Sequence, residues 1–261
     1  MFAALYPRLM PLRTVEATRY VMPFREGGSL PGLVEASDDG LYVVKFRGAG
    51  QGPKALVAEV VAGELGRALG LNVPELVRVE LDPGFANAEP DEEIQDLLRR
   101  SGGSNLGVDF LPGALSFNPA AGSAPSAALA ADVVWFDALV TNVDRTAKNT
   151  NLLMWHKRLW LIDHGASLYF HHAPARTPGD ERTPFPLIAD HVLLPFAGSI
   201  RDADARLAPR VTPELLREVA SAIPPEWLDD GDVQTYATYL ERRIAEPRAF
   251  VEEAEGGRGR R

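Results

Sequence analysis

The feature that most constrains the fold of this chain is a polar run, residues 141–151, enclosed between two apolar segments. Before it, Ala127 to Val140 is almost entirely apolar and predicts a buried helix. After it, Leu152 to Trp155 and Leu159 to Ile162 are short β-type runs joined by a tight turn, which predicts a hairpin. The polar run is therefore expected to be a short loop held between a core helix and a hairpin.

This loop and the end of the hairpin contain the candidate catalytic side chains. Asp144 and Asn149 lie five residues apart in the loop, and Asp163 follows the second strand and precedes His164 and Gly165. Glycine lets the backbone turn sharply, so the carboxylate of Asp163 can face the loop. Oxygen ligands of this kind suit Mg²⁺ or Mn²⁺. The pattern predicts Asn149 and Asp163 as metal ligands, with Asp144 directed at an acceptor hydroxyl, which are the requirements of phosphoryl transfer.

Two other interpretations apply to parts of this segment. Asp and Asn also favour turns for purely structural reasons. Arg145 is a candidate catalytic residue, or else a brace that pairs with a carboxylate of the loop. Four of the five histidines, His164, His171, His172 and His191, are not expected to bind a metal, because their spacing fits no metal-ligand pattern.

An upstream segment supplies a candidate phosphate-binding pair. Lys45 lies in the apolar strand predicted from Leu41 to Phe46, where an unpaired ammonium is costly. A helix predicted from Pro53 to Leu69 contains Glu59, which is placed to pair with Lys45. A strand Lys followed by a helix Glu is the pair that contacts ATP phosphates in kinases. Ahead of it lies a glycine-rich segment whose backbone N–H groups are expected to cover the phosphates; it includes Gly27, Gly28 and Ser29.

Two stretches resemble a known family. The run WFDALVTNVDRTAKNTNLL, followed by LWLIDHGASL, resembles the HipA-like kinases, and AEVVAGELGRALGLNVPE is similar to their helix and following turn. The Asn-x-Asp-Arg-x-x-x-Asn wording is shared with type II phosphatidylinositol 4-kinases. The resemblance covers roughly residues 20–170. The chain is shorter than the HipA toxins and is expected to lack their N-terminal subdomain.

The resemblance implies a Ser/Thr kinase that uses ATP and Mg²⁺, or Mn²⁺. Residue by residue, it implies that Asp144 is the catalytic base, that Asn149 and Asp163 hold the metal, and that Lys45 contacts the phosphates with Glu59 as its partner. It also implies that Ser29 is a candidate for autophosphorylation.

The expected fold is α+β, of the protein-kinase-like bilobal type. Residues 1–106 are expected to form a small β-rich N-lobe with one helix, and residues 107–113 a hinge in which Phe110 or Leu111 lies near adenine. Residues 114–255 are expected to form a larger, mainly helical C-lobe with the catalytic and metal-binding loops. Its last two helices are expected from Thr212 to Ile223 and from Val233 to Glu255. Residues 256–261 are expected to be a disordered tail.

Composition limits the partners. The formal charge is −9, which makes nucleic acid an unlikely direct partner. The sequence contains no cysteine, so disulfides, thiolate catalysis and cysteine zinc sites are excluded. No membrane span is predicted, because the longest uncharged stretch is interrupted by proline and glycine. The expected location is the cytoplasm, and the oligomeric state is not predicted.

Three functions remain open at this point. The first is a HipA-like kinase that phosphorylates Ser or Thr of another protein or of itself. The second is a kinase acting on a lipid headgroup or small molecule, and the absence of a basic amphipathic helix weighs against the lipid. The third is a nucleotide-binding pseudokinase that acts as an interaction module. The joint presence of Lys45, Asp144, Asn149 and Asp163 weighs against the third.

Overall fold

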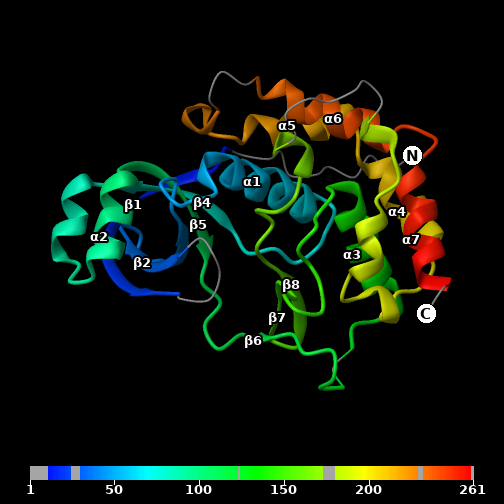
Figure 1. The fold of residues 1–261 in the computed structure, drawn as a ribbon, viewed down its shortest axis with the longest axis horizontal. Helices are drawn as coiled ribbons and strands as arrows, with labels where there is room; N and C mark the ends of the chain where they lie inside the picture. Colours follow the sequence, from blue (N-terminus) through cyan, green and yellow to red (C-terminus); the bar gives the residue numbers. More distant parts are fainter. Residues whose placement is uncertain (1–10, 25–29, 123, 173–179, 229–231, 260–261) are drawn as a thin grey trace.

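The structure is a computed structural model, and it describes residues 11–24, 30–122, 124–172, 180–228 and 232–259. It has a β-barrel at one end and a group of helices at the other, with helix α1 between them (Figure 1). Within these ranges no helix is both long enough and apolar enough to cross a bilayer.

Five strands close the barrel in the order β1-β2-β3-β5-β4, and only the β1–β4 contact is parallel. Inward-facing side chains such as Val34, Tyr42, Val44 and Val79 form its core. Alternation of buried and exposed positions fixes the register, since a shift by one residue would turn the apolar side chains outward. The strands are β1 (Arg13–Pro23), β2 (Gly32–Ala36), β3 (Leu41–Lys45), β4 (Leu76–Leu81) and β5 (Gly103–Asp109).

Two α-helices accompany the barrel. Helix α1 (Gly52–Ala68) has proline in its first turn and is buried on nearly all sides. Helix α2 (Glu92–Arg100) begins at Asp91, whose carboxylate accepts hydrogen bonds from the backbone N–H groups of Glu93 and Ile94. The apolar side chains of α2 are few, but they pack into the barrel core, and this tertiary contact makes the otherwise charged segment a stable element.

The chain leaves the barrel at Phe110. Residues 107–109, expected as part of the hinge, instead pair with β3 and β4 as the end of β5. The backbone N–H of Phe110 donates to the carbonyl of Leu41, and Gly113 has a positive φ of 76°. The connection between the barrel and the rest of the chain is therefore the short stretch from Phe110 to Gly113.

The loop between helix and hairpin is found where the sequence predicted it. Helix α3 (Ala127–Leu139) is capped by Ser126 and contributes fully buried side chains, including Trp135 and Phe136. The hairpin is β7 (Leu152–Trp155) and β8 (Arg158–Leu161), and β6 (Leu115–Ser116) adds a third strand beside β7.

The C-terminal part consists of α4 (Ile200–Leu207), α5 (Pro213–Ser221), α6 (Gln234–Ile244) and α7 (Ala249–Gly259). One helix was expected from Val233 to Glu255, but α6 ends before Pro247, which has no N–H to continue the helix. The disordered tail expected from residue 256 is also wrong as far as Gly259. Its first residues extend α7, where Gly257 packs against Leu194 and Arg258 pairs with Glu255.

Short 3₁₀ helices complete the described chain, at Pro83–Ala88, Tyr169–His172, Asp180–Arg182, Pro186–Asp190, Leu194–Phe196, Ala208–Arg210 and Pro225–Trp227. The apolar side chains fall into two clusters. The smaller fills the barrel, and the larger joins α1 to α3, the hairpin and the C-terminal helices.

Candidate active site

Lys45 lies at the junction of the barrel and the helical part. It is the last residue of β3, and its Nζ pairs with Oε1 of Glu59 in α1. The same Nζ lies 2.6 Å from Oδ1 of Asp163, which is 118 residues away in the sequence. The side chain of Lys45 is 13% exposed and that of Glu59 is 1% exposed, whereas that of Asp163 is 48% exposed. One ammonium therefore holds a buried and an accessible carboxylate together.

The charges in this cluster determine its protonation. Burial alone would lower the pKa of Lys45, but attraction to Glu59 and Asp163 outweighs burial and raises that pKa. Burial also raises the pKa of Glu59 against the attraction of the ammonium. For Asp163 the attraction of Lys45 outweighs burial and lowers the pKa to about 2. Lys45 is thus a cation and Asp163 an anion at neutral pH.

The backbone after β8 turns Asp163 toward this cluster. Asp163 has a φ of 56°, in the left-handed region that Asp tolerates better than most residues. The next backbone N–H, of His164, lies near the Glu59 carboxylate and acts to lower the pKa of Glu59, against the effect of burial. A Cβ on Gly165 would lie 3.1 Å from Oε1 of Glu59, so glycine permits the close approach of this turn to α1.

Hydrogen bonds within the loop orient Asp144. Its Oδ2 accepts from Nδ2 of Asn149 at 2.8 Å and from Nδ2 of Asn151 at 3.3 Å. Its backbone N–H donates to Oδ1 of Asn142 at 3.1 Å, and the N–H of Thr146 donates to the carbonyl of Asn149 at 2.9 Å. The loop is thus closed on itself, with the partly exposed carboxylate of Asp144 held from two sides.

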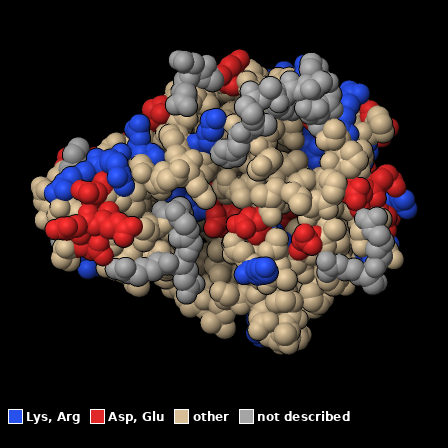
Figure 2. Space-filling model, in the orientation of Figure 1, with Lys and Arg blue, Asp and Glu red and all other residues tan. Residues whose placement is uncertain are grey.

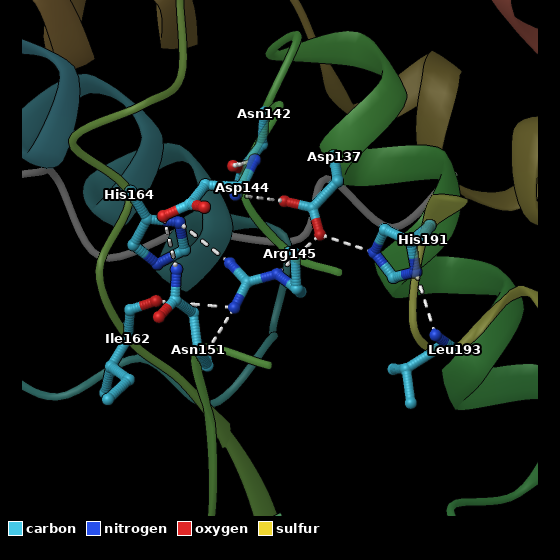
Figure 3. Close-up of polar contacts among 9 residues, drawn as sticks. All are labelled: Asp137, Asn142, Asp144, Arg145, Asn151, Ile162, His164, His191 and Leu193. Carbon is cyan, nitrogen blue, oxygen red and sulfur yellow. Dashed lines mark hydrogen bonds and ion pairs between the residues drawn. The ribbon is translucent and has the colours of Figure 1, made fainter. Parts of the chain in front are cut away.

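Arg145 is buried and lies at the centre of a polar network (Figure 3). Its Nε donates to Oδ2 of Asp137 in α3 at 2.6 Å. Its Nη1 donates to the carbonyls of Asn151 and Ile162, just outside the two ends of the hairpin, and Nη2 lies 3.3 Å from Nδ1 of His164. The guanidinium thus connects α3, the loop and both ends of the hairpin.

The sequence did not single out Asp137 and His191 as part of this network. Nε2 of His191 lies 2.8 Å from Oδ2 of Asp137, and the N–H of Leu193 donates to Nδ1 of His191. His191 reaches the loop because its segment pairs with Thr146 and because the N–H of Val192 donates to the carbonyl of Arg145. The available signal was an acidic residue inside an apolar helix, since a buried carboxylate needs a partner.

These buried groups have strongly shifted pKa values. Burial opposes the charged form of Asp137, but Arg145 and His191 outweigh it and lower its pKa. Burial lowers the pKa of His164 to about 3, and the nearby positive charge of Arg145 acts in the same direction. The pKa of His191 is also lowered by burial, although Asp137 opposes the shift. Both histidines are therefore neutral at physiological pH.

The segments that contain Asp144 and Asp163 lie side by side. The N–H of Ile162 donates to the carbonyl of Asn151, whose side chain holds Asp144, and Arg145 bonds the carbonyls of both Asn151 and Ile162. Acidic side chains are visible at the centre of the molecular face where the barrel meets the helical part (Figure 2).

The oxygen atoms of Asn149 and Asp163 suit Mg²⁺ or Mn²⁺, which are bound through one or two carboxylates completed by waters and phosphate oxygens. Both side chains are exposed. Within the described ranges, no group of three or more His, Asp or Glu side chains is gathered to hold a metal by itself. The donors at these two positions are one amide oxygen and one carboxylate.

The other predicted positions lie as follows. Gly27, Gly28 and Ser29 are outside the described residues. Phe110 and Leu111 stand where the chain leaves the barrel; Phe110 is half-buried and Leu111 is buried.

A model of the HipA-like kinase family matches residues 18–181. No curated protein is similar enough in sequence to count as a match. The Helicobacter pylori proinflammatory kinase CtkA has a similar structure, with a TM-score of 0.59 and 14% sequence identity, covering 96% of this chain and 99% of that one.

A Golgi casein kinase with Mn and ADP bound is also similar, with a TM-score of 0.52 and 14% identity, covering 94% of this chain and 73% of that one. At such identities the similarity concerns the fold, which is kinase-like in both cases.

Proposed function

Because this chain belongs to the HipA-like kinase family, we propose that it transfers the γ-phosphoryl group of ATP to a serine or threonine hydroxyl of a protein, with Mg²⁺ or Mn²⁺. The observation that carries the proposal is the ammonium of Lys45, which lies against Glu59 and also 2.6 Å from Asp163. A strand lysine, a helix glutamate and a carboxylate after a hairpin are the parts that bind ATP phosphates and metal in protein kinases.

In the proposed reaction Asp144 accepts a proton. The oxygen of the acceptor hydroxyl forms a bond to the γ-phosphorus, and the bond from that phosphorus to the bridging oxygen of ADP breaks. The hydroxyl proton passes to the carboxylate of Asp144, which Asn149 and Asn151 hold by hydrogen bonds at 2.8 and 3.3 Å. Fixing the carboxylate in the loop removes the need to orient it during the reaction.

Lys45 is proposed to bind the phosphates of ATP, with Glu59 keeping its ammonium in place. Asn149 and Asp163 are proposed to hold the metal, which when bound neutralises charge on the phosphate oxygens. Asp163 would hold such a metal with a carboxylate that now contacts Lys45, and its side chain is accessible for that role.

We propose that the barrel and the helical part act as two lobes around the stretch from Phe110 to Gly113, and that adenine binds beside Phe110 and Leu111. The glycine-rich residues Gly27, Gly28 and Ser29 are proposed to cover the phosphates, with Ser29 as a site of autophosphorylation. Incubation with ATP followed by intact-mass analysis tests this last point, because phosphorylation of Ser29 adds one phosphate that a Ser29→Ala variant lacks.

Two considerations support a protein acceptor. The resemblance described above implies a Ser/Thr kinase, and one structural neighbour is a casein kinase, a kinase named for a protein acceptor. A panel of acceptors distinguishes the alternatives: a protein mixture and casein, phosphatidylinositol vesicles, and small hydroxyl compounds. Labelling confined to the vesicles or small molecules would replace the protein acceptor, and nucleotide binding without any transfer would indicate a pseudokinase.

The central test uses radiolabelled ATP with Mg²⁺ and compares the wild type with Asp144→Asn and Asp163→Asn. Each change removes a carboxylate while keeping its shape, and each should lower transfer by a factor of about 100 or more. Asp202→Asn, at an exposed carboxylate of α4, is the matched control and should transfer like the wild type. Unchanged transfer in both site variants would refute the proposed roles.

A further inference from the structure

We propose that His164 is a positioning residue, whose ring nitrogen Nδ1 accepts a hydrogen bond from Arg145 and thereby fixes the Asp163 turn against the catalytic loop. This proposal rests on the proposed function. The proposed function uses Asp163 and does not by itself require a role for the neighbouring His164.

The backbone of His164 contacts the barrel side of the site. Its N–H lies near the carboxylate of Glu59 and favours the charged form of that group, which pairs with Lys45. The turn that contains Asp163 thus lies against α1. Gly165, next in the chain, keeps this approach close, because a Cβ there would lie 3.1 Å from Oε1 of Glu59.

The ring of His164 contacts the opposite side. Nδ1 lies 3.3 Å from Nη2 of Arg145. A guanidinium has only donors, so Nδ1 must be unprotonated and act as the acceptor. Geometry therefore fixes the tautomer, with the proton on Nε2. Arg145 in turn bonds the carbonyl of Ile162, the residue before Asp163.

These contacts bracket Asp163 on both sides. Arg145 bonds the carbonyl on the N-terminal side of Asp163 and the ring on its C-terminal side, while Gly165 keeps the turn close to Glu59. The carboxylate of Asp163 projects from a turn with a φ of 56°, which needs such support to stay in the left-handed region. Loss of the ring acceptor would leave a buried donor of Arg145 without its partner and loosen one side of this bracket.

A purely space-filling role makes a different prediction. The ring is 1% exposed and packs edge-to-face on Phe136, with ring centres 6.1 Å apart. If only this packing mattered, Phe would be the best replacement and Asn one of the poorest. If the acceptor matters, the order of catalytic activity is reversed, because Asn presents an oxygen close to the place of Nδ1 and Phe presents none.

The test compares His164→Asn and His164→Leu, which are nearly equal in shape and differ in the acceptor, together with His164→Phe, which keeps a ring. We expect kcat with radiolabelled ATP to stay within about fivefold of wild type for Asn and to fall roughly 10–100-fold for Leu and Phe, the range typical of residues that orient metal ligands. Thermal unfolding should rank the variants differently, with Phe at least as stable as Asn.

A second readout does not depend on turnover. Binding of a fluorescent ATP analogue is titrated with Mg²⁺ and repeated in EDTA. The Leu and Phe variants should need roughly tenfold more Mg²⁺ than Asn to reach half-maximal binding, and all should bind alike in EDTA. If one apolar variant does not fold, the other supplies the comparison. If neither folds, the Asn variant alone decides, because it must retain activity despite losing the ring.

Two failures are distinguishable. If the wild type neither transfers phosphate nor binds the analogue more tightly with Mg²⁺, the proposed function fails. If the wild type does both and the folded apolar variants match Asn in kcat and in Mg²⁺ dependence, the function stands and the role of His164 is overturned. An Asn variant as inactive as Leu also overturns it.

Discussion

Lys45 shows how one residue can satisfy opposing requirements. Its aliphatic stem belongs in the apolar strand that the sequence predicted, and its ammonium would be costly there without partners. Glu59 supplies a permanent partner inside the protein, and Asp163 an accessible one that a metal can take over. The lysine thus remains charged in the absence of nucleotide.

Replacing this lysine separates its chemical role from its packing. Lys45→Met keeps the length of the side chain and removes the ammonium, and we expect phosphoryl transfer to fall about 100-fold or more because phosphate charge is no longer neutralised. Lys157→Met, in the exposed turn of the hairpin, is the control and should retain activity. The measurement is the initial rate of transfer from radiolabelled ATP, and equal rates in the two variants would contradict the assigned role.

His164 should also make the stability of the protein depend on pH. Its pKa in the folded protein is about 3, mainly because of burial and then because of Arg145, whereas the usual value is 6.5. As the pH falls, His164 therefore becomes protonated at a higher pH in the unfolded chain than in the folded protein. Stability is full above about pH 6.5 and decreases toward pH 3, by about 1 kcal/mol per pH unit from this one proton.

His164→Asn should remove that contribution. Denaturant unfolding between pH 7 and pH 4.5 measures the slope, which should be shallower in the variant than in the wild type by roughly one bound proton. Phe at the same position should remove the contribution equally, because neither replacement titrates in this range. A slope that survives both substitutions would contradict the buried, neutral imidazole.

The sequence alone identified those candidate residues whose relevant neighbours are close to them in the sequence. Asp144 and Asn149 lie in one loop, and Lys45 was recognised from the apolar strand around it. It did not reach the pairing of Asp137 with His191, because those residues are 54 positions apart and meet only after the segment at Thr146 has paired. The role of Arg145 stayed open for the same reason, since the carbonyls that it binds become adjacent only when the hairpin forms.

At the scale of elements, Arg145 joins a helix, a loop and both ends of a hairpin. Its side chain bonds Asp137 of α3 and the carbonyls of Asn151 and Ile162. Arg145→Met would leave a buried carboxylate without its main partner, which costs about 3–5 kcal/mol. We therefore expect a large loss in denaturant stability and loss of transfer activity.

The control for Arg145→Met breaks an ion pair at the protein surface. Arg206 bonds Asp132 at 2.6 Å, but its side chain is 47% exposed. Arg206→Met should cost no more than about 1 kcal/mol, as expected for a surface pair. If both variants lost a similar amount of unfolding free energy, burial of the Arg145 network would contribute little to stability.

Element prediction succeeded where periodicity was strong and failed where packing decides. The apolar helix from Ala127 and the hairpin after it were confirmed. Helix α4 was missed because it is short and polar; only Ile200, Ala203 and Leu207 of its side chains are buried. The helix expected from Val233 to Glu255 was too long. Its apolar pattern continues across Pro247, but the hydrogen bonds of a helix do not, because proline has no backbone N–H.

At the scale of the whole molecule, ligand binding should raise stability. Anything that binds the folded state alone stabilises it, by about 2.7 kcal/mol at a concentration 100 times the dissociation constant. For a protein of this size ATP with Mg²⁺ should raise the unfolding temperature on the order of 5 °C. EDTA should remove most of this shift, and the Lys45→Met variant should show little of it in scanning fluorimetry. An equal shift with and without Mg²⁺ would argue against the metal site.

Global architecture was predictable only through resemblance. Short strands at intervals predicted a β-rich N-terminal part, but nothing local predicts that β1 lies parallel to β4 and closes the barrel. The placement of α1 was also beyond sequence reasoning. A helix buried on nearly all sides has no marked apolar face, so periodicity does not tell which neighbours it packs against.

That placement bears on how the molecule would open. The apolar side chains of α1 belong to the larger cluster, with contacts to α5 and to the segment Pro225–Trp227, whereas β3 belongs to the barrel. A tilt of the barrel would carry Lys45 away, while Glu59 and Asp163 would stay behind with each other. Two carboxylates left without a cation repel, so the open form is electrostatically penalised, and a divalent ion entering between the two parts would take over the missing positive charge.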